Sequence, residues 1–166
     1  MQDEKKLEYP TIQTTKLLCE IRRLEWTIST DGIMTVTGTG AMEMENIYDD
    51  FPWADYVKYV DELVIGEGVT TVGNSALYKA EYLKKVTLPD SITAIYDSAF
   101  CDCISLERIN LPENLEMVGV YTFYNTAITR LIVPETVNMF DEVFGYKYSD
   151  ELVICGYNGS AEFDGR

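Results

Sequence analysis

The chain has 166 residues, which suits a single domain, and at this length roughly 70% of the surface of the unfolded chain can be buried. Its 13 basic and 28 acidic residues give a net charge of -15. This charge argues against nucleic acid as a partner, because a nucleic-acid groove needs clustered basic side chains. The absence of histidine excludes Ser-His-Asp and Cys-His catalysis and every histidine-based metal site. No run of 18 apolar residues is present, so the sequence predicts no insertion into a membrane.

Residues 1–18 are polar and aperiodic, and we expect this N-terminal segment to be flexible. The segment has no apolar stretch of the kind found in a signal peptide. Two interpretations therefore stay open: the protein is intracellular, or it is secreted and its leader has been removed.

Residues 19–59 are predicted to form an N-terminal cap. Alternating residues from Leu24 to Ser29 and from Ile33 to Gly38 predict two strands, joined by a turn at residues 30–32. Residues 54–59 predict a short helical turn, preceded by Trp53 as a plug over the first coil. A stack of coils needs such a cap, because its first coil otherwise exposes an apolar face and an open sheet edge.

Residues 60–154 repeat one phrase every 22 or 23 residues, in about four and a half coils of 21–23 residues. Each copy contains a short strand, Leu-x-x-Val-x-Leu-Pro, then a second extended stretch and a turn entered at Ala-Phe. Such units stack on their neighbours, so the sequence predicts a solenoid, closed by a C-terminal cap at residues 155–166. The positions expected to be buried are Leu88, Ile95, Phe100, Leu111, Val118 and Phe123.

The four cysteines are predicted to be free thiols. Cys19 precedes the repeats and Cys155 follows them, so four or five coils separate the two by roughly 20 Å, beyond the disulfide reach of about 7 Å. Cys101 and Cys103 lie two residues apart on one turn, a spacing that rarely bridges without strain.

Equal positions of successive repeats stack into columns on the sheet face. One exposed position holds Glu62, Lys85, Arg108 and Arg130. The next exposed position holds Val64, Thr87, Asn110, Ile132 and Val153. A basic column is unexpected in so acidic a chain, because like charges about 5 Å apart repel each other.

Two explanations of the basic column stay open. Its side chains pair with an acidic column of Asp90, Glu113 and Glu135, at a small gain per pair, or they form a groove for an anion or an acidic glycan. In the second case the candidate partner-binding residues are Lys85, Thr87, Arg108, Asn110, Arg130 and Ile132.

Tyrosines near the turns offer a second candidate surface. They either cover the edges of the coils or form a protein-binding rim. These residues are Tyr78, Tyr96, Tyr121, Tyr124, Tyr146 and Tyr148.

No motif for catalysis or for a cofactor is present. The chain lacks a Gly-x-Gly-x-x-Gly loop, a Walker sequence and the Asp-x-Asp-x-Asp-Gly spacing of a calcium loop. Paired carboxylates for glycoside hydrolysis need a cleft, which short regular turns do not supply. The sequence therefore predicts no enzymatic activity, no cofactor and no metal.

The repeats and the cap resemble the BspA-like, treponemal-type leucine-rich repeats of bacterial surface proteins. The cap positions that carry the resemblance are Cys19, Leu24, Trp26, Asp31, Gly32, Met34, Val36, Gly38, Gly40, Met42, Pro52 and Trp53. The ending at residues 156–161 is also similar. This chain departs from the pattern at Glu20, which stands in place of a glycine, in keeping a repeat cysteine only at Cys103, and in an exit helix cut short by residues 164–166.

The resemblance implies a leucine-rich-repeat solenoid, a β-rich α/β fold with short parallel strands and an N-terminal hairpin cap. It also implies a non-enzymatic protein-interaction or adhesion module, extracellular or on the cell surface, that binds a protein or glycan of a host or neighbouring cell. We expect a monomer. The alternative is a structural spacer or intracellular scaffold without a ligand of its own.

Overall fold

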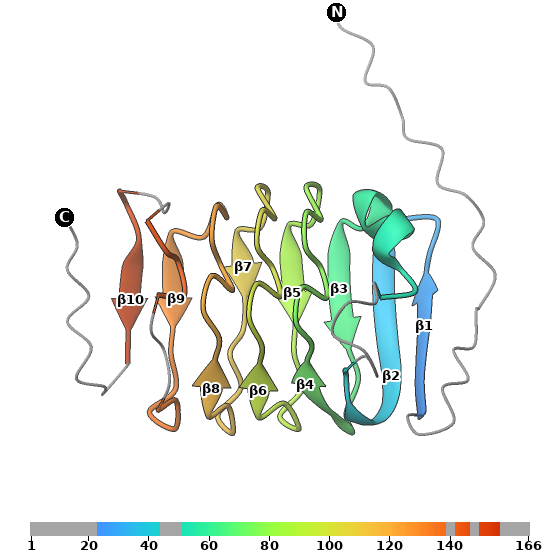
Figure 1. The fold of residues 1–166 in the computed structure, drawn as a ribbon, viewed down its shortest axis with the longest axis horizontal. Coiled ribbons are helices and arrows are strands. Elements are labelled where there is room, and N and C mark those ends of the chain that lie inside the picture. Colours follow the sequence, from blue (N-terminus) through green and yellow to red (C-terminus); the bar gives the residue numbers. More distant parts are fainter. Residues whose placement is uncertain (1–22, 44–50, 139–141, 147–149, 157–166) are drawn as a thin grey trace, which may run out of the picture.

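A computed structural model of the protein describes residues 23–43, 51–138, 142–146 and 150–156. The predicted N-terminal segment, Cys19, and all but two residues of the predicted C-terminal cap lie outside these ranges. Over the described residues the chain winds into a stack of coils, with short strands side by side along the stack (Figure 1). The predicted solenoid is confirmed.

The N-terminal cap is a β-hairpin, as the sequence predicts. Strand β1 (Arg23–Ile28) pairs antiparallel with β2 (Ile33–Ala41), with Trp26 opposite Val36. The 3-10 helix η1 (Ala54–Tyr59) follows and matches the predicted helical turn. Trp53 is buried at its start, and its indole Nε1 donates a hydrogen bond of 2.7 Å to the carbonyl oxygen of Ala76 in the first coil. Trp53 therefore plugs that coil.

Strand β2 begins both sheets of the stack. Residues 33–36 pair in parallel with β3 (Glu62–Ile65), and residues 40–41 pair in parallel with β4 (Val69–Val72). Figure 1 shows β3 and β4 on one side of β2 and β1 on the other. The corner between β3 and β4 needs Gly68, whose φ is +97° and whose Cβ, if present, would lie 2.6 Å from the carbonyl oxygen of Gly38.

Two parallel ladders extend from this start. The first adds β5 (Lys85–Thr87) and β7 (Arg108–Ile109) to β3, and the second adds β6 (Ala94–Ile95) and β8 (Met117–Val118) to β4. Glu62, Lys85 and Arg108 are register partners, so each coil advances 23 residues. The last strands, β9 (Arg130–Ile132) and β10 (Val153–Cys155), form a separate parallel pair.

The turns at one end of the coils form a third stack, held by backbone hydrogen bonds. The N–H of Leu77 donates to the carbonyl of Ala99 (2.8 Å), and the N–H of Phe100 donates to that of Thr122 (3.1 Å). One residue in each of these turns is left-handed: Lys79, Asp102 and Asn125, with φ of 59°, 60° and 55°. The turns are therefore as regular as the strands.

The core runs through the middle of the stack. The rings of Phe100 and Phe123 are fully buried with centroids 6.1 Å apart, and Phe144 packs next, 5.6 Å from Phe123. Leu88, Ile95 and Val118 are also buried, as predicted. The prediction is wrong for Leu111, which is only half-buried because it borders a groove on the sheet face.

Three of the four cysteines lie within the described residues, and all three are free thiols. Cys103 is fully buried, and its thiol donates a hydrogen bond of 3.1 Å to the carbonyl oxygen of Leu77. Burial strongly raises the pKa of this thiol, because the thiolate loses its hydration. Cys103 thus behaves as a small core residue.

Replacing Phe100 with alanine is expected to lower the free energy of unfolding by about 3–5 kcal/mol, because the change leaves a cavity between stacked rings. The measurement is urea unfolding followed by circular dichroism. Ile104→Ala, at an exposed position, is the control and is expected to cost far less. A loss below about 1 kcal/mol for Phe100→Ala would show that the ring is not in the core.

Treating the native protein with iodoacetamide at pH 8 is expected to leave Cys103 unmodified and to modify the half-buried Cys155 first. Peptide mass spectrometry reads the result, and denatured protein serves as the control in which all thiols react. The protein is also expected to migrate identically with and without reductant. Equal labelling rates for the two thiols in the native protein would contradict the burial of Cys103.

Candidate functional site

The predicted basic column lies on the ladder of β3, β5 and β7. Lys85 is the register partner of Glu62 on one side and of Arg108 on the other, as the repeat alignment predicts. Thr87 pairs with Val64 in the next exposed column. Arg130 lies on β9, which pairs with β10 and not with β7 within the described part of the chain. The column is therefore interrupted between Arg108 and Arg130.

This interruption coincides with a shorter connection. Six positions separate Phe100 from Leu106, but only five separate the equivalent Phe123 from Ile128. The next strand therefore starts one residue earlier, and the ladder that joins β5 to β7 does not continue to β9. Figure 1 shows β7 and β9 as neighbours that belong to different sheets.

A groove of about 1060 Å³ lies on the sheet face at this break. All six candidate partner-binding residues line it: Lys85, Thr87, Arg108, Asn110, Arg130 and Ile132. The sequence missed Glu107, Ala127 and Thr129, which also line the groove. The shorter connection is the sequence signal that could have indicated them.

The groove carries three basic side chains and one acidic one, although the chain as a whole has a net charge of -15. Lys85 forms an ion pair of 3.5 Å with Glu62 one coil back, and both side chains are about 40% exposed, so solvent screens the pair. Arg108 and Arg130 are exposed and form no ion pair within the described part of the chain. Two guanidinium groups are therefore free to bind an anion.

The predicted pairing of this column with Asp90, Glu113 and Glu135 is wrong. Lys85 pairs instead within its own column, with Glu62. The backbone N–H of Asp90 donates to the carboxylate of Glu67 (3.2 Å), so these acids lie along the corner of the coil and not against the basic column.

The second predicted column needs one correction. Val153 was placed beside Ile132, but Val153 is the register partner of Arg130, and Ile132 pairs with Cys155. The final strand therefore extends to Cys155, one residue past the predicted last coil. The exposed side chains of Ile132 and Val153 lie on neighbouring strands, two positions apart in register.

Asn110 has a structural contact that the sequence did not predict. Its side-chain amide donates 2.8 Å to the carbonyl oxygen of Leu88, and its side-chain oxygen accepts 2.9 Å from the N–H of the same residue. The ladder between β5 and β7 ends one position earlier, so Asn110 satisfies backbone groups that have no strand partner. This amide is occupied in the structure and shapes the groove.

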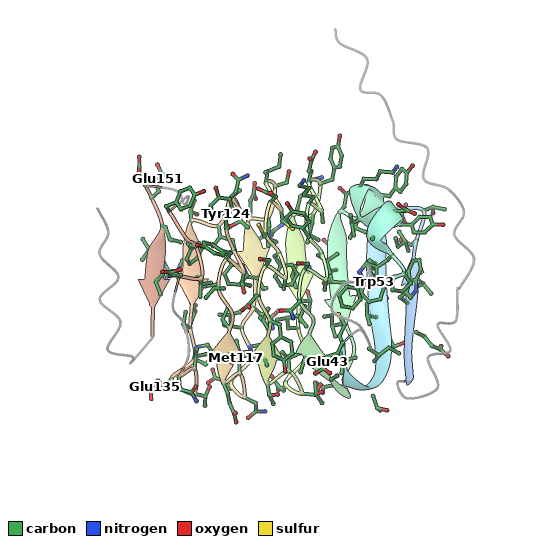
Figure 2. All side chains as sticks on the ribbon, viewed as in Figure 1. Glu43, Trp53, Met117, Tyr124, Glu135 and Glu151 are labelled. Carbon is green, nitrogen blue, oxygen red and sulfur yellow. The ribbon has the colours of Figure 1, made fainter. Side chains whose placement is uncertain are left out.

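Tyrosines gather on the turn side of the stack, where Figure 2 labels Tyr124, away from Met117 and Glu135 at the opposite end of the coils. Tyr124 lies between Tyr121 and Tyr146, at centroid distances of 6.0 and 5.3 Å. Tyr96 is half-buried, and Tyr148 lies outside the described residues.

Within the described ranges, no group of three or more cysteine, aspartate or glutamate side chains is arranged to hold a metal ion. In the same part of the chain, no helix is long and apolar enough to cross a membrane.

The match to known families covers residues 55–150, for which the matching family is described as a BspA type leucine-rich repeat region in six copies. The chain belongs to this family, as the resemblance of its cap and repeats implied. No curated protein matches the chain.

Solved leucine-rich-repeat structures share the fold. A protein from Eubacterium ventriosum is 24% identical, with a TM-score of 0.60 over 88% of this chain and 42% of that one. The Treponema pallidum protein TpLRR is 19% identical, with a TM-score of 0.55 over 84% and 71%. A protein from Bacteroides ovatus is 22% identical, with a TM-score of 0.56 over 79% and 39%. This chain thus spans less than half the length of the first and third.

Replacing Asn110 with alanine is expected to destabilise the fold by about 1–3 kcal/mol, because the backbone groups of Leu88 lose their partners. Asn110→Asp is expected to be destabilising as well, since a carboxylate can accept from the N–H but cannot donate to the carbonyl. Thermal unfolding measures both, with Thr87→Ala as the matched control on the same face. Equal stability of wild type and Asn110→Ala would show that this clamp contributes nothing.

Proposed function

We propose that this chain is a non-enzymatic binding module whose sheet-face groove binds an acidic segment of a protein or glycan. The observation that supports the proposal is the pair of exposed, unpaired guanidinium groups of Arg108 and Arg130 at the break between β7 and β9. Arginine presents a planar fork of donors that matches carboxylate and sulfate oxygens, so the groove offers two such forks.

The surroundings of the two arginines favour a ligand over a purely structural role. A basic site on an acidic molecule is costly only if its charges repel each other without a partner, and Lys85 already has Glu62. Ile132 is 64% exposed at the groove and gives an apolar surface for the ligand to cover. Thr87 and Thr129 add hydroxyl groups to the lining.

We further propose that the module acts in adhesion, on the surface of a bacterial cell or outside it. Membership of the BspA type family supports this, together with the resemblance of the cap to bacterial surface proteins. The alternative, a spacer or intracellular scaffold, is favoured by the regularity of the coils, which hold their shape without a ligand.

The binding test uses two probes, a hexaglutamate peptide and a heparin hexasaccharide, measured by calorimetry at 50 and 300 mM salt. Arg108→Gln with Arg130→Gln is expected to weaken binding of the preferred probe about ten-fold or more at low salt and to leave the melting temperature unchanged, because both side chains are exposed and unpaired. The preferred probe tells a protein ligand from a glycan ligand.

Lys84→Gln is the matched control, because Lys84 lies beside the same strand but pairs with Asp61 (3.4 Å) and does not line the groove. This variant is expected to bind as the wild type does. If neither probe binds the wild type, or if Lys84→Gln weakens binding as much as the double variant, the groove is not an acidic-ligand site and the spacer alternative gains.

A further inference from the structure

A row of tyrosines on the turn side is interrupted by one cysteine. The position after the buried core residue of each turn holds Tyr78, Cys101 and Tyr124 in successive coils, 23 residues apart. The backbone confirms the alignment, since the N–H of Lys79 donates to the carbonyl of Cys101 (2.9 Å) and the N–H of Asp102 donates to that of Tyr124 (3.0 Å). One aromatic ring is therefore missing from the middle of the row.

The missing ring leaves a hollow of about 440 Å³. Besides two serines, its lining consists of Tyr78, Cys101, Asp102, Tyr121, Tyr124 and Tyr146. Tyr78 is 42% exposed, Tyr121 37% and Tyr146 83%, whereas Cys101 is only 9% exposed. The rings thus form the rim, and the thiol lies deeper.

The far wall of the hollow is held in place by its own contacts. The ring of Tyr124 meets Tyr121 and Tyr146 edge to face, at 89° and 71°. Gly145 lets these rings approach the last coil, because a Cβ at this position would lie 2.7 Å from a ring atom of Tyr121. A hydrogen bond between the Tyr124 and Tyr146 side chains raises the pKa of Tyr124 to about 12, so its ring stays neutral at physiological pH.

The charge of the hollow is one-sided. Asp102 lines it and accepts a hydrogen bond from the amide of Asn125 (2.7 Å), while no lysine or arginine is among the lining residues. Burial raises the pKa of the Cys101 thiol, and the Asp102 carboxylate raises it further, so this thiol stays uncharged. A carboxylate within a ring of neutral tyrosines lacks only a cation.

The chain itself shows that a ring of this row accepts one. The ammonium group of Lys79 lies 4.9 Å from the ring centroid of Tyr78, at cation–π distance. Tyr78 and Tyr124 are two coils, or roughly 10 Å, apart. A cation midway therefore lies roughly 5 Å from each position, within the limit of about 6 Å for such a contact.

We propose that this hollow binds an arginine or lysine side chain of a basic protein partner, with the tyrosine rings around the cation and Asp102 as its counter-ion. This site differs from the sheet-face groove in position and in charge, and a net charge of -15 attracts a basic partner from a distance. The module then has two sites of opposite preference, one for acidic and one for basic ligands.

The test follows the amide NMR spectrum of the full chain during titration with the peptide Ac-Gly-Arg-Gly-NH2. A second peptide carries citrulline in place of arginine, which keeps the shape and removes the charge. The arginine peptide is expected to shift the resonances of Cys101, Asp102 and Tyr124 in a saturable way, and the citrulline peptide is expected to bind at least about three-fold more weakly.

Two variants locate the site. Cys101→Tyr restores the missing ring, at a position where the neighbouring coils already hold tyrosine, and is expected to abolish the shifts without unfolding the chain. Asp102→Asn removes the charge but keeps an acceptor for Asn125, and is expected to weaken binding about three-fold or more. Arg108→Gln, on the sheet face, is the control and is expected to bind the peptide as the wild type does.

Three results would overturn the proposal. The first is equal binding of the arginine and citrulline peptides, and the second is unchanged binding by the folded Cys101→Tyr variant. The third is a response of the same resonances to maltotriose but not to the arginine peptide, which would make the hollow a carbohydrate site. None of these results affects the test of the sheet-face groove, which uses other residues and acidic probes.

Discussion

Strand β2 is the constraint on which the rest of the stack depends. Its residues 33–36 form the parallel ladder with β3, and its residues 40–41 form the ladder with β4. Each later strand adds to one of these two ladders with a shift of 23 residues, so the register chosen on β2 passes to every following coil up to β7 and β8. A slip by one residue on β2 would turn every side chain of the ladder to the opposite face.

The two proposed sites lie where this inherited regularity fails. On the sheet face, a connection that is one residue shorter coincides with the end of the β3–β5–β7 ladder, and the groove with Arg108 and Arg130 lies at that break. On the turn side, the backbone stays regular and only the side chain changes, from tyrosine to Cys101. A repeat protein can thus form a binding site by one deletion or by one substitution, while its hydrogen-bonded frame continues around it.

The sequence predicts the frame well, because burial in a repeat is periodic. Phe100 and Phe123 occupy equal positions and are both fully buried, and Trp53 covers the first coil as its place before the repeats suggests. The cap hairpin and the helical turn follow from strand alternation and from turn residues, which are local signals.

The deviations could not be predicted, because they depend on how neighbouring coils meet. Leu111 has the same sequence context as Leu88 but borders the break, so only Leu88 is buried. Val153 follows an interruption of the repeat pattern, which hides its register with Arg130. Asn110 was expected to face a ligand, but the end of the ladder gives it a backbone partner. All six candidate residues nevertheless line one groove, because equal repeat positions stack.

Amide hydrogen exchange of the native protein, read by NMR, tests the role of β2 most directly. The N–H groups of Gly66, bonded to Val36, and of Gly40, bonded to Gly68, join β2 to the stack. We predict that these two amides exchange only by global unfolding, and that Val133 and Val153, in the separate β9–β10 pair, exchange faster by local opening. Faster exchange at Gly40 and Gly66 than at Val133 and Val153 would show that the stack holds together without β2 and would contradict the account.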